Sequence, residues 1–389
     1  MPPGHAHLGG RTPAEFLGDY WQKCPLLIRG AFPDLSNPLS PEELAGLALE
    51  PGVECRLVAE SHGDPPWTLR HGPFQEADFT ALPPSHWTLL VQEANAHVPQ
   101  VAALLDSFRF LPNWRLDDVM VSYAADQGSV GPHVDSYDVF LIQGLGRRRW
   151  AIGEVCEQPE LIPDLPLQVM AGFTPTESWI LEPGDMLYLP PNVPHCGVAE
   201  GPCMTYSVGF RAPTHQELLG GFLEQVVTHA DPRRRYGDPD LEPTDRPGRI
   251  APEVFQDIHA IIRGAVADDG AIDDWFARFM TEPKGGPLPR ADDAPAWDEL
   301  AEVLDRTGSL ARAGDSRWAY RETAHGPLLY VDGHAYPLAD GLSPLATVLC
   351  DAPALDQATL APYLDRDPAR DLLCRLAAQG AIVPPDDGD

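Results

Sequence analysis

Two histidines and one aspartate in this sequence have the types and the spacing of a metal site. His133 and Asp135 lie two positions apart in the segment Gly-Pro-His-Val-Asp, and His195 follows 62 positions after His133. If His133 and Asp135 belong to one strand, their side chains leave the same face of it. Two imidazoles and one carboxylate can hold Fe(II) on one side and leave the other side open for a co-substrate and O2. We therefore predict that these three residues are metal ligands and form the catalytic centre.

The surroundings of the motif strengthen a signal that is weak alone, because a surface histidine beside a solvated carboxylate is common. A glycine and a proline directly precede His133. Residues 181–195 contain a Pro-Gly-Asp turn, a short apolar strand and then prolines that bend the chain before His195. These features favour a metal site over a solvated surface pair. Cys196, the neighbour of His195, is a weaker alternative ligand.

The elements that would carry these residues form a strand-rich core. Between about residues 117 and 210, short apolar runs alternate with Gly, Pro and Asn, and no long helical period interrupts them. Together with the metal motif, this pattern predicts a jelly-roll barrel. The first 100 residues mix both kinds of element, with helices expected at 12–23, 41–48 and 98–107 and strands at 25–29 and 87–91.

Beyond residue 213 the pattern changes, and the whole chain is expected to be an α+β protein. Apolar residues recur at helical spacing in 214–230, 252–265 and 272–280, and residues 283–295 have the composition of a linker. Asp332-Gly333 then forms a hairpin turn between two short apolar strands. The order of elements in this last part resembles a winged helix, with strands at 328–331 and 334–338 and helices at 344–350, 357–363 and 369–379.

Composition restricts the partners and the compartment. The formal net charge of −31 disfavours direct binding of nucleic acid and favours a basic polypeptide. The acidic C-terminal part is therefore expected to contact protein rather than DNA. No run approaches the ~20 apolar residues of a membrane helix, and the N-terminus resembles no signal peptide, so we expect a cytoplasmic protein. Seven cysteines without a Cys-x-x-Cys pair indicate neither a disulfide framework nor a structural zinc site.

The stretches 20–31, 131–153, 182–195 and 206–213 resemble the bacterial JmjC-type, cupin-like ribosomal oxygenases. These are Fe(II)- and 2-oxoglutarate-dependent protein hydroxylases. The nearest members act on an arginine of large-subunit (50S) ribosomal protein sixteen, and eukaryotic cousins act on histidine. The resemblance implies three parts: a double-stranded β-helix (jelly-roll, JmjC/cupin) oxygenase domain at 1–213, a helical dimerisation region at 214–295 and a winged-helix-like domain at 296–389. It also implies a homodimer in which the metal barrel and the winged helix of both chains surround one long acidic cleft.

Three consecutive arginines contain the candidate partner of the 2-oxoglutarate carboxylate. Strand alternation turns Arg148 to the face opposite Arg147 and Arg149. The co-substrate arginine of the resembling family aligns with Arg148, and a guanidinium offers a bidentate, permanently charged fork for a carboxylate. A solvated basic edge remains the simpler interpretation of Arg147 and Arg149. Ser122 is the second candidate co-substrate contact, through a hydrogen bond to 2-oxoglutarate.

The candidate substrate contacts lie on neighbouring strands. Asp118, Met120 and Ser122 share one strand face, where a carboxylate beside a soft apolar side chain could bind a guanidinium and its aliphatic stem. Tyr137 and Ser207 would face the same cavity mouth. The alternative is that these residues only fill the core or begin strands.

Three functions remain open from the residues. The first is an arginine hydroxylase of a basic ribosomal protein, which would release succinate and CO2. The second is a related histidine hydroxylase or lysyl demethylase. The third is a non-catalytic cupin-like binding protein, which would need neither Arg148 nor the His133, Asp135 and His195 set.

Overall fold

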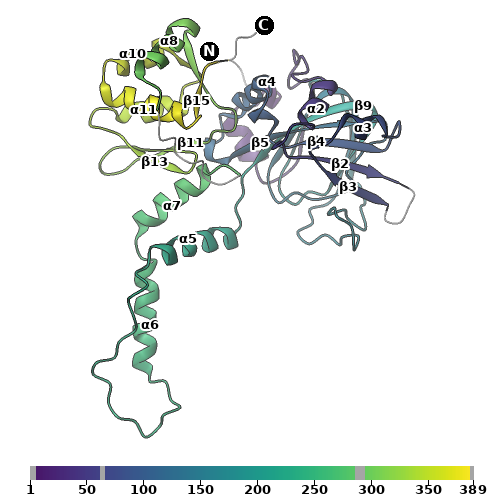
Figure 1. Cartoon of the computed structure of the whole chain (residues 1–389). Helices are drawn as coiled ribbons and strands as arrows, with labels where there is room; N and C mark the ends of the chain where they lie inside the picture. Colours follow the sequence, from purple (N-terminus) through teal and green to yellow (C-terminus); the bar gives the residue numbers. More distant parts are fainter. Residues whose placement is uncertain (1–5, 62–65, 285–293, 386–389) are drawn as a thin grey trace.

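The computed structural model of this chain describes residues 6–61, 66–284 and 294–385 (Figure 1). A barrel, an arm of three helices and a small C-terminal domain follow one another along the chain. No helix in these described ranges is long and apolar enough to cross a membrane.

The barrel is one antiparallel sheet, which in the described residues has nine strands in the order β1-β8-β6-β9-β5-β4-β2-β3, with β7 paired to β6. This sheet extends the predicted strand-rich core towards the N-terminus, because β2, β3 and β4 continue it beyond β5. The strands are β1 (Leu26–Ile28), β2 (Cys55–Glu60), β3 (Trp67–His71), β4 (Trp87–Val91), β5 (Leu116–Ala124), β6 (Val139–Ile152), β7 (Glu177–Leu181), β8 (Met186–Leu189) and β9 (His195–Phe210).

Aromatic side chains join the N-terminal helices to the barrel. Phe16 lies on α1 (Pro13–Asp19), and its ring centroid is 5.0 Å from that of Tyr188 on β8. Tyr188 in turn lies 4.8 Å from Phe140 on β6. Next along the chain, α2 (Pro41–Leu47) begins after Ser40, whose hydroxyl caps the helix by accepting a hydrogen bond from the Glu43 amide. The aromatic contacts therefore hold α1 against strands β8 and β6.

Two predicted helices differ from the observed elements. The helix expected at 12–23 ends at Asp19, because the chain turns at Gln22, where φ is 56°, and the Gln22 amide donates to the Tyr188 hydroxyl at 2.8 Å. The helix expected at 98–107 is α4 (Pro99–Ala102) followed by the tighter η3 (Ala103–Phe108). Further short helices are η1 (Ala6–Leu8), α3 (Glu76–Thr80), η2 (Ala94–Ala96) and η4 (Asn113–Arg115).

The helical arm projects away from the barrel (Figure 1). It consists of α5 (His215–His229), α6 (Pro252–Ala265) and α7 (Asp269–Thr281). Thr214 caps α5 in a reciprocal capping box with Glu217. Neither α5 nor α6 contains a buried residue, whereas α7 buries Trp275 and Met280. Helix α5 packs against α7, where the ring centroids of Phe222 and Trp275 lie 5.5 Å apart. The apolar side chains of α6 stay exposed in this chain.

The C-terminal domain has its own core, around Leu329, Leu345 and Leu373. The predicted hairpin is confirmed, since Leu328 pairs with Pro337 and Val331 with His334. Helix α8, which begins the domain, was not predicted, and most of the expected 283–295 linker lies outside the described residues. The elements are α8 (Trp297–Thr307), β10 (Ser309–Arg312), β11 (Trp318–Arg321), β12 (Leu328–Val331), β13 (His334–Pro337), α9 (Ser343–Asp351), β14 (Leu355–Asp356), α10 (Gln357–Leu364), α11 (Asp367–Ala378) and β15 (Ile382–Val383).

Candidate metal and co-substrate site

His133 and His195 face each other across a two-residue bridge. The His133 amide donates to the His195 carbonyl at 3.0 Å, and the His195 amide donates to the His133 carbonyl at 2.9 Å. Their ring centroids lie 4.2 Å apart. The strand expected to carry His133 and Asp135 is absent from the structure here. Only His133 pairs, and the chain bends after it, because the Asp135 carbonyl accepts a hydrogen bond from the Asn192 amide instead of a strand neighbour.

The three predicted ligands nevertheless come together. One ligand atom from each of His133, Asp135 and His195 lies within 4.8 Å of the others. The distance between His195 Nε2 and Asp135 Oδ2 is 3.5 Å. Cys196, the weaker alternative ligand, is not part of this group, and its thiol lies 3.8 Å from the Ser129 hydroxyl. The arrangement therefore offers two imidazoles and one carboxylate to a single ion.

Backbone carbonyls orient both imidazoles for metal binding. His133 Nδ1 lies 2.9 Å from the Gly131 carbonyl, and His195 Nδ1 lies 2.9 Å from the Val193 carbonyl. Because a carbonyl only accepts, each Nδ1 carries the proton and each Nε2 keeps its lone pair for an ion. Burial, with a smaller contribution from His133, lowers the pKa of His195 to about 4, so this imidazole is neutral near pH 7. The donor set fits Fe(II).

Arg148 turns inward as the alternation predicted. Its side chain is buried, whereas Arg147 and Arg149 each pair with Glu200 at the surface. The Arg148 guanidinium donates to the Ser122 hydroxyl at 3.2 Å and to the Gly197 carbonyl at 3.3 Å, and no carboxylate among the described residues pairs with it. Burial lowers the pKa of this guanidinium. A buried cation without a counter-ion, whose Nε also lacks an acceptor in the described chain, fits a carboxylate ligand.

One cavity of about 650 Å³ joins the two candidate sites to the predicted substrate contacts. Tyr137 lies at the mouth and is 42% exposed, whereas Asp118 and Ser207 are buried. Met120 and Ser207 are opposite each other on β5 and β9. The residues predicted from the sequence that line this cavity are His133, Asp135, His195, Arg148, Ser122, Asp118, Met120, Tyr137 and Ser207.

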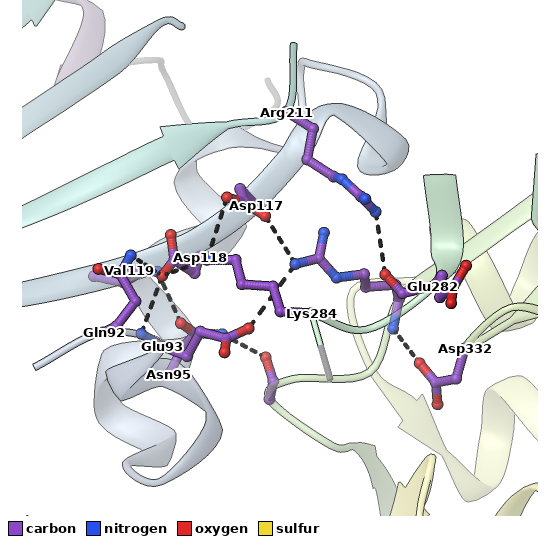
Figure 2. Close-up of polar contacts among 12 residues, drawn as sticks. Gln92, Glu93, Asn95, Asp117, Asp118, Val119, Arg211, Glu282, Lys284 and Asp332 are labelled. Carbon is purple, nitrogen blue, oxygen red and sulfur yellow. Dashed lines mark hydrogen bonds and ion pairs between the residues drawn. The ribbon is translucent and has the colours of Figure 1, made fainter. Parts of the chain in front are cut away.

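Other cavity residues were not found from the sequence. Gln92 follows β4 and Lys284 follows α7, and both line the cavity and contact Asp118 (Figure 2). Neither residue belongs to a motif. Asp117 also lines the cavity beside Asp118, because the pairing of β5 with β9 shifts register between Leu116 and Val119. A regular strand would have turned these two carboxylates to opposite faces.

Comparison with known proteins decides the family. Residues 103–218 match the JmjC domain family, and residues 265–382 match the ROXA-like winged helix family. The chain is 39% identical over 322 residues to the ribosomal protein uL16 3-hydroxylase of Escherichia coli K12, covering 80% of this chain and 85% of that protein. The chain belongs to the JmjC-domain ribosomal oxygenases.

Solved structures of ribosomal oxygenases agree with this fold. The X-ray structure of E. coli YcfD aligns with a TM-score of 0.84 at 33% identity, covering 96% of this chain and 98% of that one. The structure of E. coli YcfD in complex with cobalt and 2-oxoglutarate aligns with a TM-score of 0.80 at 34% identity, covering 95% and 97%. The predicted JmjC jelly roll and the C-terminal winged helix are therefore confirmed. The winged-helix match begins at residue 265 and includes α7, whereas the boundary at 295 stays a prediction.

Proposed function

We propose that this ribosomal oxygenase is an Fe(II)- and 2-oxoglutarate-dependent dioxygenase that hydroxylates an arginine side chain of large-subunit ribosomal protein uL16. The observation that carries the proposal is that one cavity holds the His133, Asp135 and His195 ligand set together with Arg148, whose guanidinium pairs with no carboxylate of the described chain. The relatives support the rest, since one is the uL16 3-hydroxylase of E. coli and a structure of the E. coli ribosomal oxygenase YcfD holds cobalt and 2-oxoglutarate.

The residues of the chain would divide the work in the following way. His133, Asp135 and His195 would hold the iron, and Arg148 would pair with the distal carboxylate of 2-oxoglutarate. Bound Fe(II), with 2-oxoglutarate and O2, would supply the oxidant that replaces one substrate C–H hydrogen by hydroxyl, while 2-oxoglutarate becomes succinate and CO2. Ser122 holds Arg148 in place through the hydrogen bond at 3.2 Å. The buried side chains of Leu141 and Trp150 line the cavity with apolar surface and would exclude water from its inner part.

The mouth of the cavity favours a cationic side chain. Asp118 would bind a guanidinium, and Met120 and Tyr137 would pack against its aliphatic stem. Asp117 and Glu93 stand near Asp118, so three carboxylates gather there against the two cations that pair with them, Lys284 and Arg317. With a net charge of −31, the whole chain would attract a basic ribosomal protein. We also propose that the enzyme acts in the cytoplasm, where such a substrate would be found.

Hydroxylation of a basic ribosomal protein is the direct test. The purified enzyme would be loaded anaerobically with Fe(II) and 2-oxoglutarate, mixed with O2 and a panel of ribosomal proteins, and the products analysed by mass spectrometry. We expect one added oxygen atom on an arginine of uL16. Oxidation of histidine or demethylation of lysine instead would replace the proposed substrate, and absence of any metal-dependent turnover would leave a non-catalytic binding protein.

Asp118→Asn is expected to lower kcat/KM for the ribosomal substrate by about 10- to 100-fold, because one charge-assisted hydrogen bond is worth about 1.5–3 kcal/mol. The KM for 2-oxoglutarate should not change, since the substituted side chain faces the cavity mouth. Asp126→Asn is the matched control, because Asp126 is exposed and its carboxylate accepts hydrogen bonds from the Gly201 amide and the Gln127 side chain, outside the cavity lining. Equal kcat/KM in both variants would remove Asp118 from the substrate site.

We further propose that the helical arm dimerises. Among the described residues, ten of the fourteen exposed large apolar side chains lie between residues 219 and 262. On α6, Phe255, Ile258, Ile261 and Ile262 recur at helical spacing and are 37–58% exposed. An apolar stripe of this kind is usually covered in solution. A second copy of the arm would cover it.

The double variant Ile258→Asp, Ile262→Asp is expected to be a monomer in light-scattering measurements at micromolar concentration, whereas the unaltered chain is a dimer. Each buried carboxylate would lose its hydration without gaining a partner. Val155→Asp is the control, because Val155 is 64% exposed but lies outside the arm. A monomeric mass for the unaltered chain would contradict the proposed dimer.

A further inference from the structure

Asp118 is held from one side only. Its Oδ2 accepts hydrogen bonds from Gln92 Nε2 at 2.6 Å and from the Glu93 amide at 3.0 Å. Its Oδ1 accepts no hydrogen bond from the described residues and points towards Gly209, where an added Cβ would lie 3.5 Å from this oxygen and 4.0 Å from the Tyr137 ring. The absence of a side chain at Gly209 therefore leaves a space between one carboxylate oxygen and an aromatic ring.

Lys284 brings an ammonium group to the same carboxylate. Its Nζ lies 3.1 Å from Asp118 Oδ2 and 3.3 Å from Asp117 Oδ2, and it lines the cavity mouth (Figure 2). The preceding residues are anchored to the barrel, because Arg211 donates to the Met280 carbonyl at 2.8 Å and to the Glu282 carbonyl at 3.2 Å. Lys284 is one of only two lysines in the sequence. The Lys284 ammonium, which comes from outside the barrel, therefore contacts the two carboxylates of the cavity, Asp117 and Asp118.

We propose that the Lys284 ammonium is an intramolecular competitor that occupies the substrate's place on Asp118. The cationic side chain of the substrate displaces Lys284 when it binds. This inference rests on the proposed function. In the resting chain Asp118 Oδ2 accepts from three donors, and only the Lys284 ammonium is a contact from outside the barrel. A guanidinium pairs with both oxygens of a carboxylate, whereas an ammonium is a point charge. When Lys284 leaves, Asp118 Oδ2 can accept a hydrogen bond from the substrate guanidinium. The second hydrogen bond of the guanidinium then goes to the open Asp118 Oδ1.

The exchange leaves no buried charge without a partner. Asp117 keeps the guanidinium of Arg317, whose nitrogen lies 2.8 Å from Asp117 Oδ1. Asp118 keeps Gln92 and the Glu93 amide. The Lys284 side chain is 32% exposed, so its ammonium can return to water. Burial lowers the pKa of Lys284, but the nearby Asp118 and Asp117 carboxylates raise it by more. The Lys284 ammonium is therefore charged at neutral pH. One cation replaces another, and the charge of the mouth stays constant.

A tethered competitor weakens every ligand that must displace it by one common factor. Lys284 would therefore lower the apparent affinity of Asp118 for every competing side chain equally. It would not change the ratio of affinities between two such side chains. A partly exposed ion pair contributes up to about 1 kcal/mol, which corresponds to about a fivefold change in apparent affinity. Weakly bound basic side chains would be excluded from the site at low concentration.

The order of KM values in three enzymes separates this role from its opposite. We expect Lys284→Met to lower the KM for the uL16 substrate by about fivefold. Lys284→Arg should raise this KM above that of the unaltered enzyme, because a guanidinium that binds Asp118 in a bidentate way is harder to displace. A residue that instead positions Asp118 for the substrate would give the reverse order, with Lys284→Met highest. Equal KM values in all three would show an inert ion pair, and either of these results would overturn the inference.

Two controls make the kinetic result specific. Lys23→Met removes the other lysine, which is exposed and donates to the Leu17 carbonyl at 3.1 Å, and should leave the KM unchanged. The KM for 2-oxoglutarate should also be the same in every variant. If the unaltered enzyme hydroxylates no ribosomal substrate, the proposed function fails and this inference falls with it. If the unaltered enzyme is active but the order of KM values is wrong, only the inference fails.

Chemical labelling tests the displacement without turnover. Because Lys23 and Lys284 are the only lysines, an amine-acylating reagent followed by mass spectrometry reports each one separately. A saturating uL16 substrate should raise the acylation rate of Lys284 severalfold and leave that of Lys23 unchanged. A slower or unchanged rate at Lys284 would show that its ammonium stays on Asp118 when the substrate binds, and the inference would be wrong.

Discussion

Replacement of His195 by alanine is expected to abolish metal-dependent hydroxylation. His195 supplies one of the two imidazoles of the ligand set, and its Nδ1 is already engaged by the Val193 carbonyl at 2.9 Å. Loss of a partner that merely orients a metal ligand typically lowers affinity or activity 10- to 100-fold. Loss of the ligand itself should lower turnover by more than about 100-fold.

Two measurements together would check this expectation. Turnover would be followed as hydroxylated substrate by mass spectrometry, and Fe(II) binding would be followed by anaerobic titration calorimetry. His229→Ala is the matched control, because His229 Nδ1 also bonds a backbone carbonyl, that of Gln225 at 2.8 Å, but its ring is exposed. Thermal unfolding of both variants would show that the barrel remains folded. Near-normal turnover of His195→Ala with Fe(II) would place the metal elsewhere.

The second large effect concerns 2-oxoglutarate. Arg148→Met should raise the KM for 2-oxoglutarate by about 100-fold or more, because a buried carboxylate that loses its partner costs about 3–5 kcal/mol. The affinity for the ribosomal substrate should change far less, since Asp118 and Tyr137 form the mouth of the same cavity. The result would be measured as succinate release over a range of 2-oxoglutarate concentrations.

Arg149→Met is the control for this prediction. Arg149 is the next residue on β6, but its side chain is half exposed and pairs with Glu200, so its removal should change the KM less than about twofold. Binding can also be read without turnover. With Fe(II) present, 2-oxoglutarate should raise the melting temperature of the unaltered enzyme and of Arg149→Met, but not that of Arg148→Met. An equal rise in all three would contradict the assignment of Arg148.

Some of this site follows from local sequence patterns. The types and spacing of His133, Asp135 and His195 select one metal chemistry, and strand alternation alone separates Arg148 from Arg147 and Arg149. These predictions depend on what a residue can ligate and on which side of a strand it faces, and both properties are local. The hairpin at Asp332-Gly333 is a local signal of the same kind.

The remaining features depend on pairings between distant segments. The register shift after Leu116 brings Asp117 and Asp118 to one cavity, and the contact of Lys284 with Asp118 joins positions 166 residues apart. The bridge that orients His133 against His195 replaces the expected strand. Chain composition indicates neither which strands adjoin nor where a ladder slips, because both follow from the packing of the whole barrel. The metal chemistry was therefore encoded in short motifs, whereas the acidic mouth and the lysine that occupies it arise only when the arm and the barrel meet.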